Sequence, residues 1–205
     1  TADADGTVLL PTRGGYFALD VAAGAAQLTS LGPNHARAAR FDPAVVVTAW
    51  TNRKIRLAYA GYFGHMWELY SMWAWIAVIA AVSYARHMPE ERAATLASVT
   101  AFVSIAAGAV MSVLAGWRAD RVGKARVALF AMAVSGACAI LTAVAFGGPV
   151  WIFFLVVVVW GASISPDSAQ FSALVADNSP GHQAGSLMTL QTALGFAMTF
   201  FTGQA

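Results

Sequence analysis

The sequence has few charged residues. Only 11% of its 205 residues are Asp, Glu, Lys or Arg, whereas soluble domains average about 25%. With 59% hydrophobic residues and a mean hydropathy of +0.63, a soluble fold of this size could not cover its own apolar surface. The scarcity of charge therefore argues against a soluble globular domain and favours a membrane protein.

The sequence has one cysteine and only a small excess of positive charge. The single Cys138 lies in an apolar run, so it offers neither a disulfide nor metal-ligand spacing. The formal net charge of +2 indicates no nucleic-acid partner. There is no Ser–His–Asp set, paired Asp or His-rich motif, so we expect no enzyme, cofactor or metal site. An initiator Met and a signal-peptide pattern are also missing, which suggests a piece of a longer protein.

Long apolar runs fill most of the chain. A helix rises about 1.5 Å per residue, so about 20 apolar residues cross a hydrocarbon core of about 30 Å. Because lipid offers the backbone no hydrogen bonds, each run should be an α-helix. The sequence therefore predicts an all-α membrane protein, a bundle of about five transmembrane helices at 57–85, 94–117, 126–147, 150–174 and 186–205.

The beginning of the chain has a different composition. Residues 1–40 mix small, polar and turn residues, which predicts a mostly irregular linker with a weak helix at most from Val21 to Leu31. Asp42 and Pro43 predict the N-cap and first residue of a short interfacial helix within 41–56. Basic residues are denser before the first span and at 118–126 than between the first two spans. The positive-inside rule therefore places the N-terminal segment and the 118–126 loop in the cytoplasm.

The loop "GWRADRVGKAR" between the second and third spans has the most specific spacing. We expect Gly116 to end the second span and let a neighbour approach, and Gly123 to form a tight turn with positive φ. Asp120 should lie at a helix N-terminus or pair with an Arg. A positive-inside loop alone would explain the basic residues, but not the Asp and the two Gly. The candidate conformational residues are Gly116, Asp120, Arg121, Gly123, Lys124 and Arg126.

This loop resembles the signature of the major facilitator superfamily of secondary transporters, where it occurs between spans two and three and again between spans eight and nine. The stretch "RLAYAGYFGHMWELYSMWAWI" is similar to the seventh span of a bacterial branch, and "AGSLMTLQTALGFAMTFFTG" to its eleventh. The resemblance covers about residues 41–205. It implies a partial major-facilitator fold, spans seven to eleven of twelve, with the N-terminal half of the same protein as partner.

The resemblance also implies a function. A carrier of this kind moves a small solute across the bacterial inner membrane by alternating access, with the solute held near the midplane between two halves. The branch includes carriers suspected of moving cyanate or nitrate, yet from residue 57 onward every Arg and Lys lies at a span end or in a loop, where none could pair with a buried anion. A non-transporting structural or assembly subunit of a membrane complex stays the alternative.

The first span carries two ionisable side chains, His65 and Glu68. Glu68 lies roughly 16 Å into the span by helical rise, near the bilayer centre, where an ionised side chain costs at least about 3 kcal/mol. The two residues are three apart and share one face, so they could exchange a proton and couple transport to H⁺ in a symport. The packing interpretation is that each bonds a neighbouring helix. Trp67 and Tyr70 are further candidate solute residues.

The fourth span carries a second polar stripe. Pro166 should break its helix, and Ser163, Asp167 and Gln170 fall on one helical face. We interpret Asp167 and Gln170 as candidate solute or proton residues on a kinked gating helix, or else as a polar helix end. In the fifth span, Gln191 should make packing hydrogen bonds.

The second span has small residues every four positions. This ladder allows close packing of helix backbones in lipid, and it would also suit a sliding seam. Its members are Ser104, Gly108, Ser112 and Gly116.

Overall fold

The computed structural model describes residues 7–12, 15–20, 27–30 and 43–202, with side chains described from 43 to 200. The chain divides into two units, Thr1–Asp42 and Pro43–Ala205. The division falls within two residues of the predicted end of the N-terminal segment.

The first unit contains a small antiparallel sheet of β1 (Thr7–Thr12), β2 (Gly15–Asp20) and β3 (Gln27–Ser30), in the order β1-β2-β3. Thr7 lies opposite Asp20 and Thr12 opposite Gly15. The prediction of a mostly irregular linker is therefore wrong for these strands, because two short apolar runs separated by two residues have hairpin spacing. The prediction of a weak helix is wrong at 27–30, which form β3, and residues 21–26 and 31 of that predicted helix lie outside the described residues.

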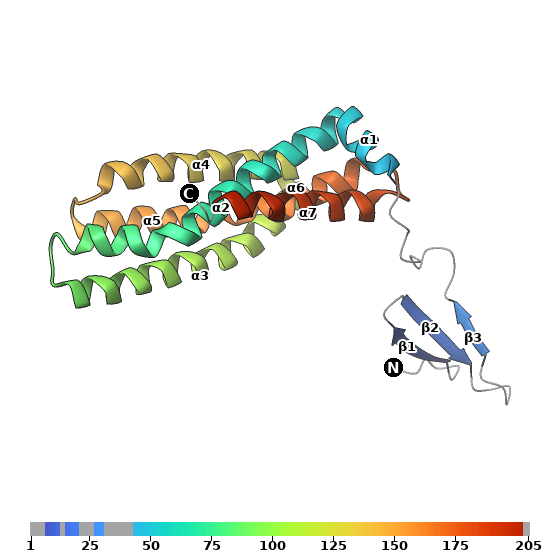
Figure 1. The fold of residues 1–205 in the computed structure, drawn as a ribbon. Helices are drawn as coiled ribbons and strands as arrows, with labels where there is room; N and C mark the ends of the chain where they lie inside the picture. The colour runs from blue at the N-terminus through green and yellow to red at the C-terminus, as the bar shows by residue number, and fades with distance from the viewer. Residues whose placement is uncertain (1–6, 13–14, 21–26, 31–42, 203–205) are drawn as a thin grey trace. The chain divides into compact units, whose positions relative to one another are not determined.

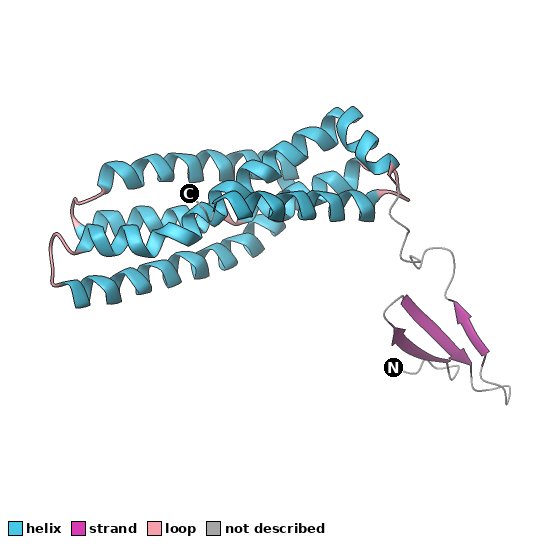
Figure 2. Ribbon diagram, in the orientation of Figure 1, coloured by secondary structure: helices cyan, strands magenta, loops and turns pink. Residues whose placement is uncertain are grey.

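The second unit is helical throughout residues 44–202 apart from short turns (Figure 1, Figure 2). This confirms the all-α bundle. Its helices are α1 (Ala44–Thr51), α2 (Arg53–Tyr84), α3 (Glu90–Val122), α4 (Lys124–Ala145), α5 (Val150–Ile164), α6 (Pro166–Asn178) and α7 (Ala184–Thr202).

Four helical segments in the described part of the chain are long and apolar enough to cross a membrane. They are α2, α3, α4 and the continuous stretch of α5 and α6 from Val150 to Asn178. These segments indicate a multi-pass membrane protein. The predicted fifth span corresponds to α7, which is not among the four, so that span stays a prediction; its residues 203–205 lie outside the described residues.

The helices extend further than their apolar runs, because charged residues continue them. Asn52 caps α2, since its Oδ1 accepts from the backbone N–H groups of Lys54 and Ile55. Residues 53–56 therefore belong to α2 and not to the predicted interfacial helix. That helix is α1, which follows Pro43, while Asp42 lies outside the described residues.

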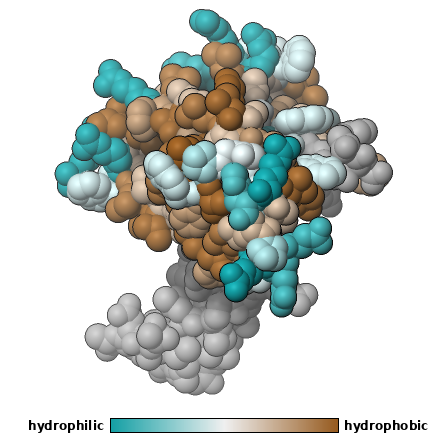
Figure 3. Space-filling model, turned by 90° about the vertical axis from the view of Figure 1, so that its left-hand side faces the viewer, coloured by the Kyte–Doolittle hydropathy of each residue, from teal (hydrophilic) through white to brown (hydrophobic). Residues whose placement is uncertain are grey.

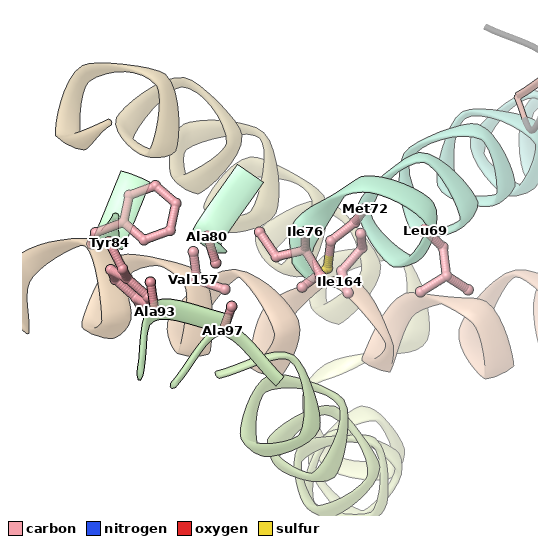
Figure 4. Close-up of a cluster of buried hydrophobic side chains, with 10 residues drawn as sticks. Leu69, Met72, Ile76, Ala80, Tyr84, Ala93, Ala97, Val157 and Ile164 are labelled. Atoms are coloured by element: carbon pink, nitrogen blue, oxygen red, sulfur yellow. The ribbon is translucent and has the colours of Figure 1, made fainter. Parts of the chain in front are cut away.

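An apolar cluster fills the bundle between α2, α3 and α5, at the end that carries the α2–α3 and α4–α5 turns (Figure 4). Figure 3 looks onto this end and shows hydrophilic residues scattered among apolar ones. On the flanks large apolar side chains face outward, as Val113 (74% exposed) and Val144 (77% exposed) do. Such flanks suit a lipid surrounding. The cluster consists of Leu69, Met72, Ile76, Ala80, Tyr84, Ala93, Ala97, Phe153, Val157 and Ile164.

Small residues bring the backbones of α3 and α5 together. A Cβ added at Gly161 would lie 2.4 Å from the carbonyl oxygen of Ser104, and one added at Gly108 would lie 2.6 Å from that of Gly161. The predicted ladder is therefore confirmed as packing at its first two members. Its last member, Gly116, has nothing within 4 Å of an added Cβ.

Candidate functional site

A close contact between a histidine and an acidic side chain is buried between α2 and α6. Nδ1 of His65 lies 2.7 Å from Oδ1 of Asp167, although the two atoms are not aligned for a hydrogen bond. The residues are 1% and 2% exposed. The helices run antiparallel here, since Gly61 of α2 meets Phe171 of α6 one turn away. Pro166 begins α6 and so puts Asp167 in its first turn, where the helix dipole favours an anion.

Glu68 bonds two other helices. Its Oε1 accepts a 2.8 Å hydrogen bond from the indole Nε1 of Trp160 in α5, and its Oε2 accepts a 3.2 Å bond from the hydroxyl of Ser135 in α4. The predicted interaction of His65 with Glu68 is therefore wrong. Residues three apart in a helix point about 60° from each other, so the two side chains meet different neighbours. Both lie against helices of the bundle.

The polar stripe of the fourth span is buried. Ser163 is 9% exposed and Gln170 is 4% exposed, with Asp167 between them. The helix does break at Pro166, which separates α5 from α6. The hydroxyl of Ser163 donates to the carbonyls of Val159 and Trp160 in its own helix, so Asp167 and Gln170 are the better site candidates.

The aromatic candidates lie apart from the contact of His65 with Asp167. Trp67 is 47% exposed on the surface of α2. Tyr70 packs edge-on against Phe196 of α7, with 6.1 Å between ring centroids. A groove of about 400 Å³ runs beside Phe196 and is lined by α7 alone. The structure thus brings neither Trp67 nor Tyr70 to His65.

The α3–α4 turn matches the predicted signature loop only in part. Gly123 has φ +98°, which confirms the predicted positive φ. Gly116 lies inside α3, which continues to Val122, so it does not end the span. Asp120 is exposed in the last turn of α3 and not at a helix N-terminus, and it forms no ion pair with any described residue. Both predictions are wrong because the charged residues extend the helix.

Basic residues of this turn make their own contacts. Nζ of Lys124 pairs with Oδ2 of Asp177 near the end of α6. The guanidinium of Arg121 lies 3.8 Å from the ring centroid of Trp117, a cation–π contact, while Arg126 is exposed. The turn is thus tied to α6, the helix that carries Asp167.

Two site residues, Trp160 and Ser135, escaped sequence reasoning, and a third, Gln191, was predicted to make packing bonds. A partly buried indole N–H needs an acceptor, and this requirement could have linked Trp160 to an acid. Ser135 lies on a stripe of small residues and had no distinct signal. Gln191 is 0% exposed, and neither of its amide atoms has a hydrogen-bond partner among the described residues, so the predicted packing bonds are wrong.

A set of buried and partly buried polar side chains inside the bundle is called the polar layer below. Within the described residues no group of three or more His, Cys, Asp or Glu side chains could hold a metal ion. Neither a protein family, nor a curated protein, nor a solved structure matches this chain. The polar layer consists of His65, Glu68, Ser135, Trp160, Asp167, Gln170 and Gln191.

Proposed function

We propose that this chain is part of a proton-coupled secondary transporter of the major facilitator type, which moves a small solute across the inner membrane by alternating access. The observation that carries the proposal is the buried pair of His65 and Asp167, 2.7 Å apart inside two candidate spans. Ionisable residues at such depth are costly and mark proton or solute pathways. The sequence resemblance supports the same class.

In this mechanism Asp167 holds the coupling proton and His65 stabilises its ionised form. Protonation of Glu68 would weaken the bonds that it accepts from Trp160 and Ser135, and α2 would then be free to shift against α4 and α5. The break at Pro166 lets α6 move relative to α5, as a kinked helix can.

The proposed orientation has the α1 end of the bundle in the cytoplasm. The hydrogen bonds from Asn52 to the carbonyl of Asn178 and from Thr48 to Gln183 bring the start of α2 and the α6–α7 turn to the α1 end. Positive residues are dense there: Arg53, Lys54, Arg56, Arg118, Arg121, Lys124 and Arg126. The opposite end has Arg86 and Arg92.

A structural subunit is the second candidate, and the close seam of α3 and α5 favours it. In that case the polar layer would only stabilise the bundle. Substitution of a polar residue would then change the stability of the protein, and neither the original chain nor the variant would move a solute or a proton.

Flux measurement separates the two. The reading frame that carries this chain is expressed and reconstituted in liposomes with an internal pH dye, and solutes are added one at a time. We expect that one of the solutes drives proton movement into the liposomes. Asp167→Asn and His65→Gln should each abolish that proton movement while the protein stays folded. Thr142→Val is the control, because its hydroxyl bonds only the carbonyl of Cys138 in its own helix. Proton-coupled flux that is unchanged in both variants would refute the proposal.

A further inference from the structure

Gln191 is a buried amide without a partner. Its side chain is 0% exposed, and both its Oε1 and its Nε2 lack a hydrogen bond to any described residue. The Nε2 atom of His65 is likewise buried and unpaired. Buried polar groups without a hydrogen bond destabilise the folded state. Such groups are therefore expected where a ligand or water molecule supplies the missing hydrogen bonds.

Helix packing puts these groups in one region. On α7, Leu187, Gln191 and Gly195 are four residues apart and share a face, and that face meets α2. The hydroxyl of Tyr59 donates to the carbonyl of Leu187, and a Cβ added at Gly195 would meet Tyr62 at 2.5 Å. Gln191 therefore lies along α2 between these two contacts.

His65 lies just beyond, at the level of Gly195. The residue that follows it, Met66, would be 3.2 Å from a Cβ added at Gly195. Since Gln191 precedes Gly195 by four residues, it lies about 6 Å along the axis from the His65 level. Along the helix axis, that separation is short enough for one small molecule to reach both levels.

The chemistry of the region favours a cation with N–H donors. Nδ1 of His65 faces the Asp167 carboxylate, so the neutral imidazole carries its proton there and Nε2 is an acceptor. The Gln191 oxygen and the carboxylate are acceptors too. Every Lys and Arg of residues 43–202 lies at a helix end or turn, so no described basic residue offers a buried partner to an anion.

We propose that His65 Nε2 and the Gln191 amide form a binding site for a small primary ammonium compound that also carries an oxygen acceptor, with the Asp167 carboxylate at Nδ1 of His65 as the counter-charge. The ammonium group donates to His65 Nε2 and to the Gln191 oxygen, and the Gln191 Nε2 group donates to the oxygen of the ligand. This site rests on the proposed transport function and names its solute class: an organic cation and not a small anion such as nitrate.

Thermal unfolding of the purified protein in detergent tests the site. Ethanolammonium should raise the Tm, whereas tetramethylammonium, which has the charge but no N–H donor, should not, and nitrate should not. In the absence of ethanolammonium, Gln191→Leu should have a higher Tm than the unsubstituted protein, because the substitution removes an unpaired amide from an apolar surrounding. It should also weaken ethanolammonium binding by about tenfold or more, the effect of one lost charge-assisted hydrogen bond.

A purely structural Gln191 predicts the opposite sign, with a lower Tm in Gln191→Leu and an unchanged probe response. If that variant does not fold, Gln191→Glu provides a second arm, since an added carboxylate should strengthen the ethanolammonium shift. Thr142→Val, a buried polar residue of α4, is the matched control and should leave the probe shift unchanged.

The outcomes also separate this site from the transport proposal. Proton-coupled flux of nitrate that depends on Asp167 would overturn the cation site and leave the transporter intact. A Tm response to tetramethylammonium equal to that of ethanolammonium, or an ethanolammonium shift retained in Gln191→Leu, would overturn the site as well. A shift specific to ethanolammonium without flux of any solute would retain the site and count against the transporter.

Discussion

The two halves of α2 differ in what they pack against. From Leu69 to Tyr84 the helix contributes to an apolar cluster with α3 and α5. There the hydroxyls of Tyr84 and Thr100 join α2 to α3 through a buried hydrogen bond of 3.0 Å. Before Leu69 the same helix meets α6 and α7 through His65 and Tyr59, and it meets α4 and α5 through Glu68.

This contrast indicates that the two halves of α2 have different roles. Lipid tails are as apolar as a Leu side chain, so helices in a membrane associate through close packing and hydrogen bonds. The apolar half of α2, from Leu69 to Tyr84, offers close packing and has no Asp, Glu, His, Lys or Arg side chain. The polar half contains groups whose bonds change with protonation. We infer that the first is the fixed part of the bundle and the second the part that responds to ligands.

The largest loss of stability should come from a change at Phe153, an α5 residue that packs in the apolar cluster against the second half of α2. It is 0% exposed and packs edge-on against Tyr84, with ring centroids 5.6 Å apart. Phe153→Ala should lower the free energy of unfolding by about 4 kcal/mol, because a large buried side chain leaves a cavity. Chemical unfolding in detergent measures it, and the ethanolammonium response should persist. A loss below about 1 kcal/mol would show that this half is loosely packed.

A smaller effect is expected at the α3–α5 seam. Gly161→Ala puts a Cβ 2.4 Å from the backbone carbonyl of Ser104, which cannot move aside without shifting α3. The loss in unfolding free energy should be about 2 kcal/mol, as overpacking typically costs. Gly136→Ala is the matched control, since an added Cβ there meets nothing within 4 Å and the better helix propensity of Ala should be neutral or stabilising. Equal effects in both variants would contradict a close seam.

The smallest effect is expected at Glu68, where the two halves join. Glu68→Gln keeps an oxygen acceptor for Trp160 but removes the charge that strengthens both of its bonds. Stability should fall by about 1 kcal/mol, while the pH dependence of solute uptake should weaken. Trp160→Phe removes the indole donor without the charge change and separates the two effects. An uptake profile unchanged in Glu68→Gln would exclude Glu68 from proton coupling.

Several features followed from local patterns. The apolar runs predicted the helices of the bundle, Pro166 predicted the break between α5 and α6, and Gly123 predicted a positive φ. The end of α3 was placed too early, because Arg and Asp residues such as Asp120 were taken as loop although they extend this helix to Val122. The strands of the N-terminal unit were missed because short runs show little periodicity.

The sequence by itself determined which residues would be helical and which polar side chains would be costly in lipid, since both depend on composition and period along the chain. Only the tertiary structure decided the partners: Asp167 for His65, Trp160 and Ser135 for Glu68, and none among the described residues for the Gln191 amide. The physical reason is that the helical period fixes the face on which a side chain lies, but the order in which helices pack decides what that face meets.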